Sequence, residues 1–265
     1  MTDTSTYIHP SAIIEDGAQI GAGCRIGAFC VVGEKVVLGD NVELLSHVVV
    51  SGDTSIGAGS KIWPFASIGS APQDLKYQGE PTKLIVGENN MIREYVTMNP
   101  GTAGGGGVTR VGDGNLFMMQ LHVGHDSQIG NNIVFANDVQ LAGHVVIGDN
   151  AVIGSMAGVH QYCRVGKGAM VGAGSIVVND VIPYGATLSE RASLAGLNLV
   201  GLKRRGYDKD KINELRHVYK TLFKGEGALA DRAKTLNEGA GDNELVRDVL
   251  EFVLANSDRA FCTPE

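Results

Sequence analysis

From Val111 to Val177 the chain reads VGDGNLFMMQLHVGHDSQIGNNIVFANDVQLAGHVVIGDNAVIGSMAGVHQYCRVGKGAMVGAGSIV, and an apolar residue returns at every sixth position. The same spacing runs from Ile8 to Ile68 and again from Val86 to Met98. Gly often follows the repeated residue, and a small or apolar residue often stands two positions before it. This hexapeptide pattern is typical of a parallel β-helix, in which each six-residue unit is one short strand and one turn.

A single six-residue unit is too small to bury a core, so three units are expected to close one triangular coil of 18 residues. Stacked coils then bury the repeated apolar residues along a common axis. Strands of successive coils pair, and each coil therefore rises ~4.8 Å. The repeats of this chain correspond to about nine coils and roughly 40 Å of β-helix.

The chain is expected to divide into a β-helix over residues 1–190 and a small α-helical domain over residues 191–265. Two interruptions, at about 69–85 and 99–110, leave the repeat in phase and predict loops that project from the β-helix. The second contains the run Gly104 to Gly107, which lacks the residues of a phosphate-binding loop and is interpreted as a flexible turn.

After Pro183 the six-residue spacing ends and helical spacing appears. Asp208 is expected to cap a helix that ends before Gly225, and further helices are predicted near 228–236 and 244–254. Such a domain would cover the open end of the β-helix core. Fold class is therefore mainly β, with a small C-terminal α-helical domain.

Composition limits the function classes. The net charge of -7 argues against nucleic acid as the partner. No apolar run approaches membrane-spanning length and no export signal precedes Ile8, so membrane insertion is not expected. Four Cys without metal-type spacing favour a reduced, cytoplasmic protein. The segment from Lys203 to Lys224 has a net charge of +5 and could attract an acidic partner, although a solvated helix face explains it equally well.

Four of the seven His lie close together in the sequence: His122, His125, His144 and His160. His122 is one position before the repeated Val123 and His125 is two positions after it, so both are expected to face outward. A satisfied core histidine and a structural histidine at a subunit interface remain alternatives to a functional role.

Residues 18 apart stack in a β-helix, which predicts a column of His125, Gly143 and Gln161 beside His144. A His beside an exposed Gly amide suits acyl transfer to a hydroxyl. The imidazole removes the proton of the attacking hydroxyl, and the Gly N–H stabilises the oxyanion. Asp126 could hold the imidazole tautomer, although adjacent residues on a strand normally diverge.

Five stretches carry a specific resemblance across essentially the whole chain: QDLKYQGEPT (Gln73 to Thr82), HVGHD (His122 to Asp126), LAGHV (Leu141 to Val145), VHQYC (Val159 to Cys163) and GLKRRGY (Gly201 to Tyr207). They resemble the UDP-N-acetylglucosamine acyltransferase family, which begins lipid A synthesis. This resemblance implies a left-handed β-helix and a homotrimer with active sites between neighbouring β-helices. It also implies transfer of an (R)-3-hydroxyacyl group from acyl carrier protein to the glucosamine 3-hydroxyl of UDP-N-acetylglucosamine, without cofactor or metal.

The resemblance also implies roles for individual residues. His125 would be the general base, Asp126 its partner and the Gly143 amide the oxyanion donor. Substrate contacts would come from Gln73, Asp74, Lys76, His122, His144, Gln161, Asn198, Arg204 and Arg205.

The chain departs from the family pattern at four positions. Asn99 stands where His is usual, and Val200 stands where Glu is usual, which affects the expected nucleotide contacts. Ala173 and Arg191 replace the Gly and His that line the far end of the acyl groove in long-chain members, and they predict a shorter acyl groove.

Three other functions are compatible with parts of the sequence. The N-acyltransferase of the same pathway carries a uridine-binding domain ahead of its repeats, whereas the repeat here begins at Ile8. A γ-class carbonic anhydrase would use His ligands for zinc, which the spacing of His122 and His125 permits. A non-catalytic scaffold gives no reason for outward His, Gln and Asp to gather along one stretch.

Overall fold

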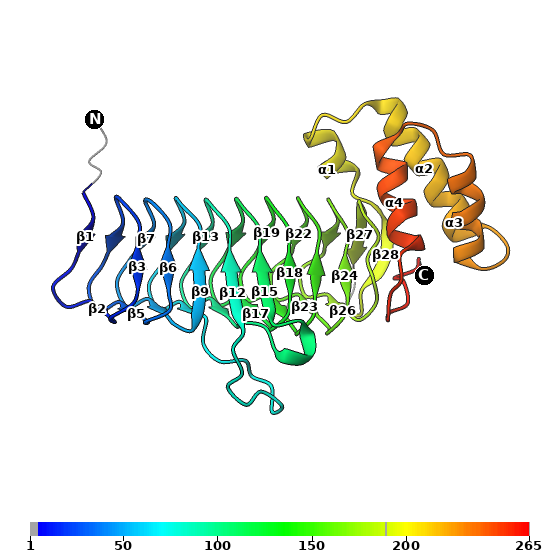
Figure 1. The fold of residues 1–265 in the computed structure, drawn as a ribbon. Coiled ribbons are helices and arrows are strands. Elements are labelled where there is room, and N and C mark those ends of the chain that lie inside the picture. Colours follow the sequence, from blue (N-terminus) through cyan, green and yellow to red (C-terminus); the bar gives the residue numbers. More distant parts are fainter. Residues whose placement is uncertain (1–4, 189, 265) are drawn as a thin grey trace.

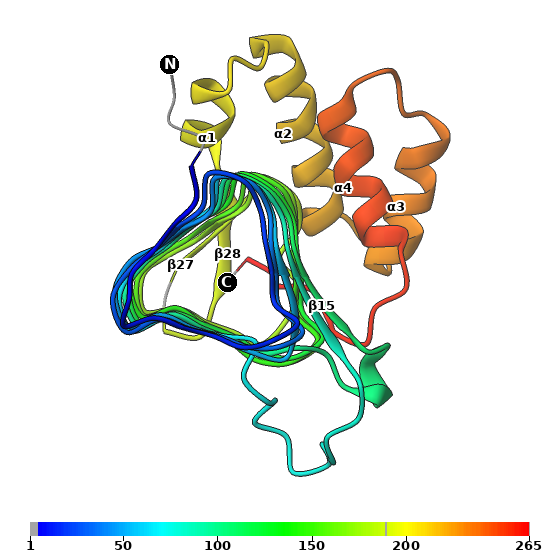
Figure 2. The ribbon, with the colours of Figure 1, turned by 60° about the vertical axis from the view of Figure 1, so that its left-hand side comes forward.

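The computed structural model describes residues 5–188 and 190–264. Short strands wind into stacked triangular coils, and the strands of each side form one parallel sheet. Figure 2, which looks nearly along the axis, shows the triangular outline, and Figure 1 shows the helices gathered at the C-terminal end of the β-helix. The predicted fold class, a mainly β left-handed parallel β-helix with a small C-terminal α-helical domain, is confirmed.

Sheets A, B and C name the three sides of the triangle. Sheet A contains β1 (Tyr7–Ile8), β4 (Arg25–Ile26), β7 (Glu43–Leu44), β10 (Lys61–Ile62), β13 (Met91–Ile92), β16 (Leu116–Phe117), β19 (Val134–Phe135), β22 (Val152–Ile153), β25 (Met170–Val171), β27 (Gly185–Leu188) and β28 (Ser193–Leu197). Sheet B contains β2 (Ile13–Ile14), β5 (Val31–Val32), β8 (Val49–Val50), β11 (Ser67–Ile68), β14 (Thr97–Met98), β17 (His122–Val123), β20 (Gln140–Leu141), β23 (Gly158–Val159) and β26 (Ile176–Val177). Sheet C contains β3 (Gln19–Ile20), β6 (Val37–Leu38), β9 (Asp53–Ile56), β12 (Lys83–Val86), β15 (Val108–Val111), β18 (Gln128–Ile129), β21 (Val146–Ile147) and β24 (Arg164–Val165).

The repeated apolar residues pair with one another along each sheet and fill the axis. Val123, for example, pairs in register with Met98 on one side and Leu141 on the other, and all three are fully buried. The rings of Phe117 and Phe135 stack with centroids 5.0 Å apart. Because the buried position recurs in every coil, the outward positions are also fixed, and these carry the polar side chains.

The three corners of the triangle are named after the sheets they join. Residues 69–82 connect β11 to β12, and residues 99–107 connect β14 to β15, so both insertions project from the B–C corner. The second contains a short 3₁₀ turn, η1 (Ala103–Gly105), where a flexible turn was expected. Both insertions thus stand over the same edge of the β-helix.

The C-terminal residues close the end of the β-helix and then form helices. Strand β27 continues sheet A, and β28 pairs with it antiparallel. Four helices follow: α1 (Leu199–Arg204), α2 (Lys209–Lys224), α3 (Leu229–Glu238) and α4 (Glu244–Leu254). The last three lie where the sequence predicted helices, with Asp208 as the N-cap of α2, whereas α1 was not predicted. The proposed domain boundary at residue 190 falls between β27 and β28 and stays a prediction.

The helices are tied to the β-helix through partly buried polar contacts. The Asp248 carboxylate of α4 accepts a hydrogen bond from the Tyr184 hydroxyl, and Lys167 Nζ lies 3.0 Å from it. None of the helices in the described ranges is long and apolar enough to cross a bilayer.

Candidate active site

The candidate site lies at the B–C corner, where three successive coils present their turns in a stack. His125 and Asp126 follow β17, Gly143 and His144 follow β20, and Gln161 and Tyr162 follow β23. Backbone hydrogen bonds join the coils: His144 N–H donates to the His125 carbonyl at 2.8 Å. The expected column of His125, Gly143 and Gln161 is therefore present, because a parallel β-helix stacks equivalent positions.

The second residue of each of these turns adopts a left-handed backbone. The φ angles are 61° at Asp126, 61° at His144 and 64° at Tyr162. At the C–A corner the equivalent position is Asn or Gly as far as Gly168, as at Asn132, because these residues enter the left-handed region at low cost, and it is Tyr184 in the last coil. For His and Tyr this backbone conformation costs free energy, which favourable contacts of their side chains must offset.

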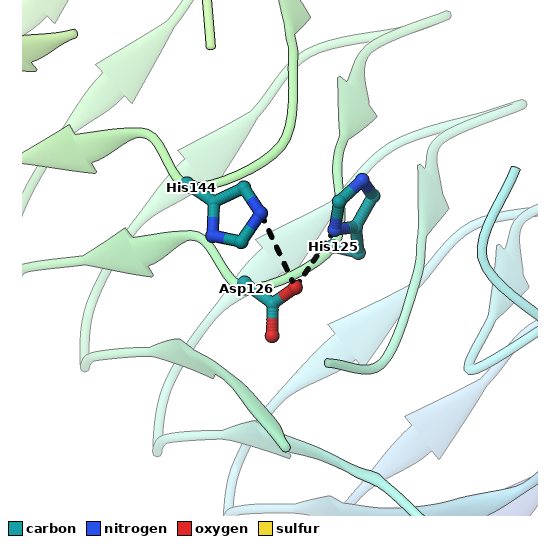
Figure 3. A group of neighbouring side chains, drawn as sticks. All are labelled: His125, Asp126 and His144. Atoms are coloured by element: carbon teal, nitrogen blue, oxygen red, sulfur yellow. Dashed lines mark hydrogen bonds and ion pairs between the residues drawn. The ribbon is translucent and has the colours of Figure 1, made fainter. Parts of the chain in front are cut away.

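His125 and Asp126 form a hydrogen-bonded pair (Figure 3). His125 Nδ1 lies 2.8 Å from Asp126 Oδ2. The left-handed turn at Asp126 removes the usual divergence of neighbouring side chains on a strand. Since an ionised carboxylate only accepts, Nδ1 carries the proton and Nε2 keeps its lone pair. His125 is therefore oriented to accept a proton at Nε2.

Asp126 is the most enclosed group of the site, and its side chain has no solvent exposure. Thr102 of the second insertion donates twice, from its N–H to Oδ1 at 2.8 Å and from its hydroxyl to Oδ2 at 2.7 Å. The Asp126 N–H in turn donates to Thr109 Oγ1 at 2.7 Å. A buried carboxylate needs such donors to remain ionised. The second insertion therefore helps to hold the His125–Asp126 pair in place.

His144 lies between His125 and Tyr162. Its ring meets His125 edge-on at 5.1 Å and stacks on Tyr162 at 4.4 Å, with an angle of 10° between the planes. Its Nε2 lies 3.7 Å from Asp126 Oδ2, too far for a hydrogen bond. Burial lowers the pKa of His144, opposed by Asp126 and helped by His125. The neutral ring can therefore donate or accept one hydrogen bond towards a ligand.

His122 lies on the outward face of β17, as expected, just before the turn that carries His125. Its Nδ1 lies 2.8 Å from Thr97 Oγ1. Burial and the neighbouring His125 lower the pKa of His122 below its usual value of 6.5.

A cavity of about 450 Å³ opens beside these turns. Most of the residues expected at the substrate site line it, together with Leu75 and Tyr162: Gln73, Asp74, Leu75, Lys76, His125, His144, Gln161 and Tyr162. The first insertion thus faces the histidines across the cavity. His122 does not line the cavity, although it lies on β17, the strand directly before the turn that carries His125.

Asn99 tethers the first insertion to the β-helix. Its side chain is buried, and Nδ2 donates to the carbonyls of Ser70 at 2.9 Å and Ala71 at 3.3 Å. Its Oδ1 is buried with no hydrogen-bond partner among the described residues. A position expected to alter ligand contacts therefore has a structural function, since it holds the start of the loop that carries Asp74.

The remaining expected site residues lie at other corners of the same chain. Asn198 is the N-cap of α1: its Oδ1 accepts from the Gly201 N–H, and its Nδ2 donates to the Gly168 carbonyl. Arg205 donates to the Asn150 carbonyl at the C–A corner, and Arg204 is exposed beside it.

The two residues expected to limit the acyl length lie near the third corner. Ala173 is exposed at the A–B corner, and Arg191 pairs with Ile176 of β26 nearby. Within one chain these residues do not meet His125, because sheet B lies between the two corners.

Sequence reasoning missed Thr102, Leu75 and Tyr162. Thr102 and Leu75 lie in the insertions, and the six-residue repeat does not predict where side chains in the insertions are located. Tyr162 carried a usable signal, because it stands 18 residues after His144 and 36 after Asp126 in a left-handed turn position.

Three ligand-type atoms of His125, Asp126 and His144 lie within 4.8 Å of one another and could by proximity hold a metal ion. The hydrogen bonds oppose that role. Both oxygens of Asp126 accept from Thr102, and the His125 nitrogen nearest to them is engaged with the carboxylate. His122, whose spacing suggested a ligand, is not part of this group.

The chain is similar to characterised acyltransferases. Residues 180–262 match the family described as UDP N-acetylglucosamine O-acyltransferase, domain 2, and residues 5–34 and 35–70 match the bacterial transferase hexapeptide (six repeats). Acyl-[acyl-carrier-protein]–UDP-N-acetylglucosamine O-acyltransferase of Rickettsia bellii is 52% identical over 99% of this chain and 93% of its own length. The Caulobacter vibrioides protein of the same name is 52% identical over 97% and 98%. The solved UDP-N-acetylglucosamine acyltransferase from Campylobacter jejuni superposes with a TM-score of 0.92 at 39% identity, covering 97% of this chain and 100% of that one.

The tether from Asn99 predicts the mobility of the first insertion. Asn99→Ala removes both hydrogen bonds to Ser70 and Ala71, each worth ~1 kcal/mol. Amides of residues 69–82 should then exchange with deuterium about fivefold faster or more in mass spectrometry. Asn137→Ala, at an exposed turn of the A–B corner, is the matched control and should leave this exchange unchanged. Equal exchange in Asn99→Ala and wild type would contradict the tether.

The lowered pKa of His122 predicts a pH dependence of stability. As the pH falls through 6.5, the unfolded chain takes up a proton at this residue before the folded protein does, so the free energy of unfolding decreases. His122→Gln should make that decrease smaller between about pH 7 and about pH 5 in urea unfolding. His217→Gln, on the exposed face of α2, is the control. An unchanged slope in His122→Gln would show that the folded protein does not resist this protonation.

Proposed function

Since the chain belongs to the UDP-N-acetylglucosamine O-acyltransferase family, we propose that its His125–Asp126 pair is the catalytic base of the transfer. The protein is an acyltransferase that moves an acyl chain from acyl carrier protein to UDP-N-acetylglucosamine in lipid A biosynthesis. One observation carries the assignment: His125 has its Nδ1 committed to a buried carboxylate and its other edge against Gly143, on the wall of the cavity.

The proposed reaction starts with the sugar hydroxyl, taken as the glucosamine 3-hydroxyl. His125 Nε2 accepts its proton while the oxygen attacks the thioester carbonyl of the (R)-3-hydroxyacyl donor. Asp126 stabilises the imidazolium that forms. The tetrahedral intermediate then collapses, the carbon–sulfur bond breaks, and the imidazolium returns the proton to the leaving thiolate. Each step uses groups that the chain supplies, so no cofactor or metal is assigned.

The Gly143 N–H is the proposed oxyanion donor. It donates to no acceptor within the described chain, and it lies on the coil directly after His125. A side chain at this position would collide with the base, because a Cβ on Gly143 would lie 2.6 Å from His125 Cε1 and Nε2. Glycine therefore keeps both the amide and the imidazole accessible to one substrate carbonyl.

The cavity lining supports the proposed sugar-nucleotide contacts. Asp74 and Lys76 offer a carboxylate and an ammonium on the first insertion, opposite the ring of His144 and the amide of Gln161. Gln73 lies at the start of the same loop and adds a second amide. His122, beside the cavity, is proposed to contact the acyl donor or sugar from sheet B.

We propose that the enzyme is a homotrimer, because its expected site residues lie on three different corners. Asn198, Arg204 and Arg205 lie near the C–A corner, and Ala173 and Arg191 near the A–B corner. Neighbouring β-helices would bring these corners to the B–C corner of another copy. Leu75, at the tip of the first insertion, is fully exposed in the single chain, as expected of an apolar residue that a partner covers. Nucleotide contacts of Arg204 and Arg205 would then come from a second subunit.

We also propose a cytoplasmic location and acyl carrier protein as the docking partner. The four cysteines are free and buried, which suits a reducing compartment. The basic segment from Lys203 to Lys224 forms the end of α1 and all of α2, with exposed Lys and Arg along it. An acidic carrier would be attracted to this surface.

His125→Ala should abolish transfer while leaving the assembly intact. General-base catalysis is typically worth ~10²–10⁴-fold, and no other group in the cavity is oriented by a buried carboxylate in the same way. Transfer is measured with acyl carrier protein thioester and UDP-N-acetylglucosamine, and assembly by size-exclusion chromatography. His9→Ala, in the first coil, is the control. Residual activity above about a tenth of wild type would require another base.

The carrier surface predicts a salt-sensitive Michaelis constant. Changing both Arg204 and Arg205 to Glu should raise the apparent KM for the acyl donor, and added salt should raise it for the wild type. Lys234→Glu on α3, outside this segment, is the matched charge reversal. If neither the double substitution nor added salt changed the KM for the donor, the segment would have only a structural function in covering the end of the β-helix.

Ala173 predicts the acyl length. In the proposed acyl groove, its exposed methyl would shorten the space for the acyl chain by about one carbon relative to Gly. Extra methylenes of the acyl chain against a fixed wall cost ~1–3 kcal/mol. Ala173→Gly should therefore shift the preferred donor towards longer chains in a competition among hydroxyacyl carrier proteins. Identical rankings for the wild type and the variant would show that this residue does not limit chain length.

A further inference from the structure

The C-terminal segment after α4 returns to the β-helix and passes beside the candidate site. It pairs with the coil at Asp180: the Asp180 N–H donates to the Ala260 carbonyl at 2.7 Å, and the Cys262 N–H donates to the Asp180 carbonyl at 2.8 Å. The red segment in Figure 1 follows this path from α4 to the last coils. The segment is therefore fixed to the coil by one parallel bridge, between Asp180 and Phe261.

Asp180 fixes this segment with its side chain as well. The residue is fully buried, and its Oδ2 accepts from Ser257 Oγ at 2.6 Å and from Arg164 Nε at 2.7 Å. Arg164 in turn lies over the Phe252 ring of α4, with its guanidinium carbon 4.3 Å from the centroid. These contacts place the intervening residue, Arg259, at a defined position next to β23.

Arg259 reaches the coil that carries Gln161. Its Nε and Nη2 donate to the Gln161 carbonyl at 3.1 Å and 2.8 Å, and Nη2 lies 2.8 Å from His160 Nδ1. An arginine only donates, so His160 Nδ1 accepts and the proton of the neutral ring is on Nε2. The longer approach of Nδ1 to the Gln161 carbonyl, at 3.3 Å, is then not a hydrogen bond.

The peptide held by Arg259 belongs to the wall of the cavity. Gln161 lines the cavity, and the Tyr162 N–H on the same peptide donates to the Gly143 carbonyl at 3.3 Å. The Tyr162 ring stacks on His144, which meets His125 edge-on. The segment also walls a second cavity of about 520 Å³ that shares His144 and Tyr162 with the first.

We propose that Arg259 is a positioning residue of the acyl transfer: its guanidinium fixes the peptide after Gln161 and the tautomer of His160, so that the Gln161 amide and the His160 Nε2–H are presented to the substrate. The C-terminal segment thereby connects the helical domain to the catalytic coil. This inference rests on the proposed function, and it adds His160, which faces solvent in the single chain, as a donor for the substrates.

The test compares Arg259→Met, which keeps the length of the side chain and removes every donor, with Arg259→Lys, which keeps the charge and loses the planar fork. Arg247→Met, on the exposed face of α4, is the matched control. The full-length protein is used throughout. Transfer kinetics with carrier thioester and UDP-N-acetylglucosamine, the melting temperature, and the ¹⁵N NMR shifts of His160 are measured for each variant.

We expect Arg259→Met to lower kcat about 10- to 100-fold, since small misplacements of positioning groups have effects of this size. Arg259→Lys should fall between it and the wild type, and Arg247→Met should remain within about twofold. In the wild type His160 should carry its proton on Nε2, and in Arg259→Met the two tautomers should mix. A merely structural role would lower the melting temperature and the amount of active enzyme without changing the kcat of the folded enzyme.

Unchanged kcat in Arg259→Met, or the same His160 tautomer in that variant and the wild type, would overturn the inference. If Arg259→Met does not fold, Arg259→Lys provides the same two measurements. The NMR comparison needs no substrate. A wild type without transfer activity would therefore overturn the proposed function, whereas an unchanged tautomer would overturn the role of Arg259.

Discussion

The 18-residue coil is the constraint on which the rest of this structure depends. Hydrogen bonds between stacked strands require every coil to repeat at the same height, so equivalent positions of successive coils form columns. Three turns separated along the sequence thus become one surface at the B–C corner. A rigid scaffold of this kind places side chains more accurately than an isolated loop can, because each turn is hydrogen-bonded to the turns on either side.

The two insertions complete the site without disturbing that register. Each leaves sheet B and enters sheet C, so each adds residues only at the corner where the histidines lie. Thr102 brings two donors to the buried Asp126 carboxylate, and Asn99 anchors the start of the loop that carries Asp74. The buried charge, the base that it orients and the loop opposite them are therefore one connected unit.

The departures from the family pattern have different physical consequences. Asn99 is buried and tethers the start of the first insertion to the β-helix. Val200 is largely exposed on α1, where it makes no contact with the cavity of its own chain. Ala173 and Arg191 lie at the A–B corner, which sheet B separates from His125 within one chain.

The sequence by itself determined the β-helix, the outward position of His122 and His125, and the column of His125, Gly143 and Gln161. These follow from a strict period, since a six-residue repeat allows only one register of buried positions and one stacking distance. The sequence suggested Asp126 as the partner of His125, but the tertiary structure decided that the two neighbouring side chains converge, because this depends on a left-handed turn that the spacing does not encode. The tertiary structure also decided the contacts of Thr102, Asn99 and Arg259, because insertions and a returning C-terminal segment have no period and are positioned by long-range hydrogen bonds.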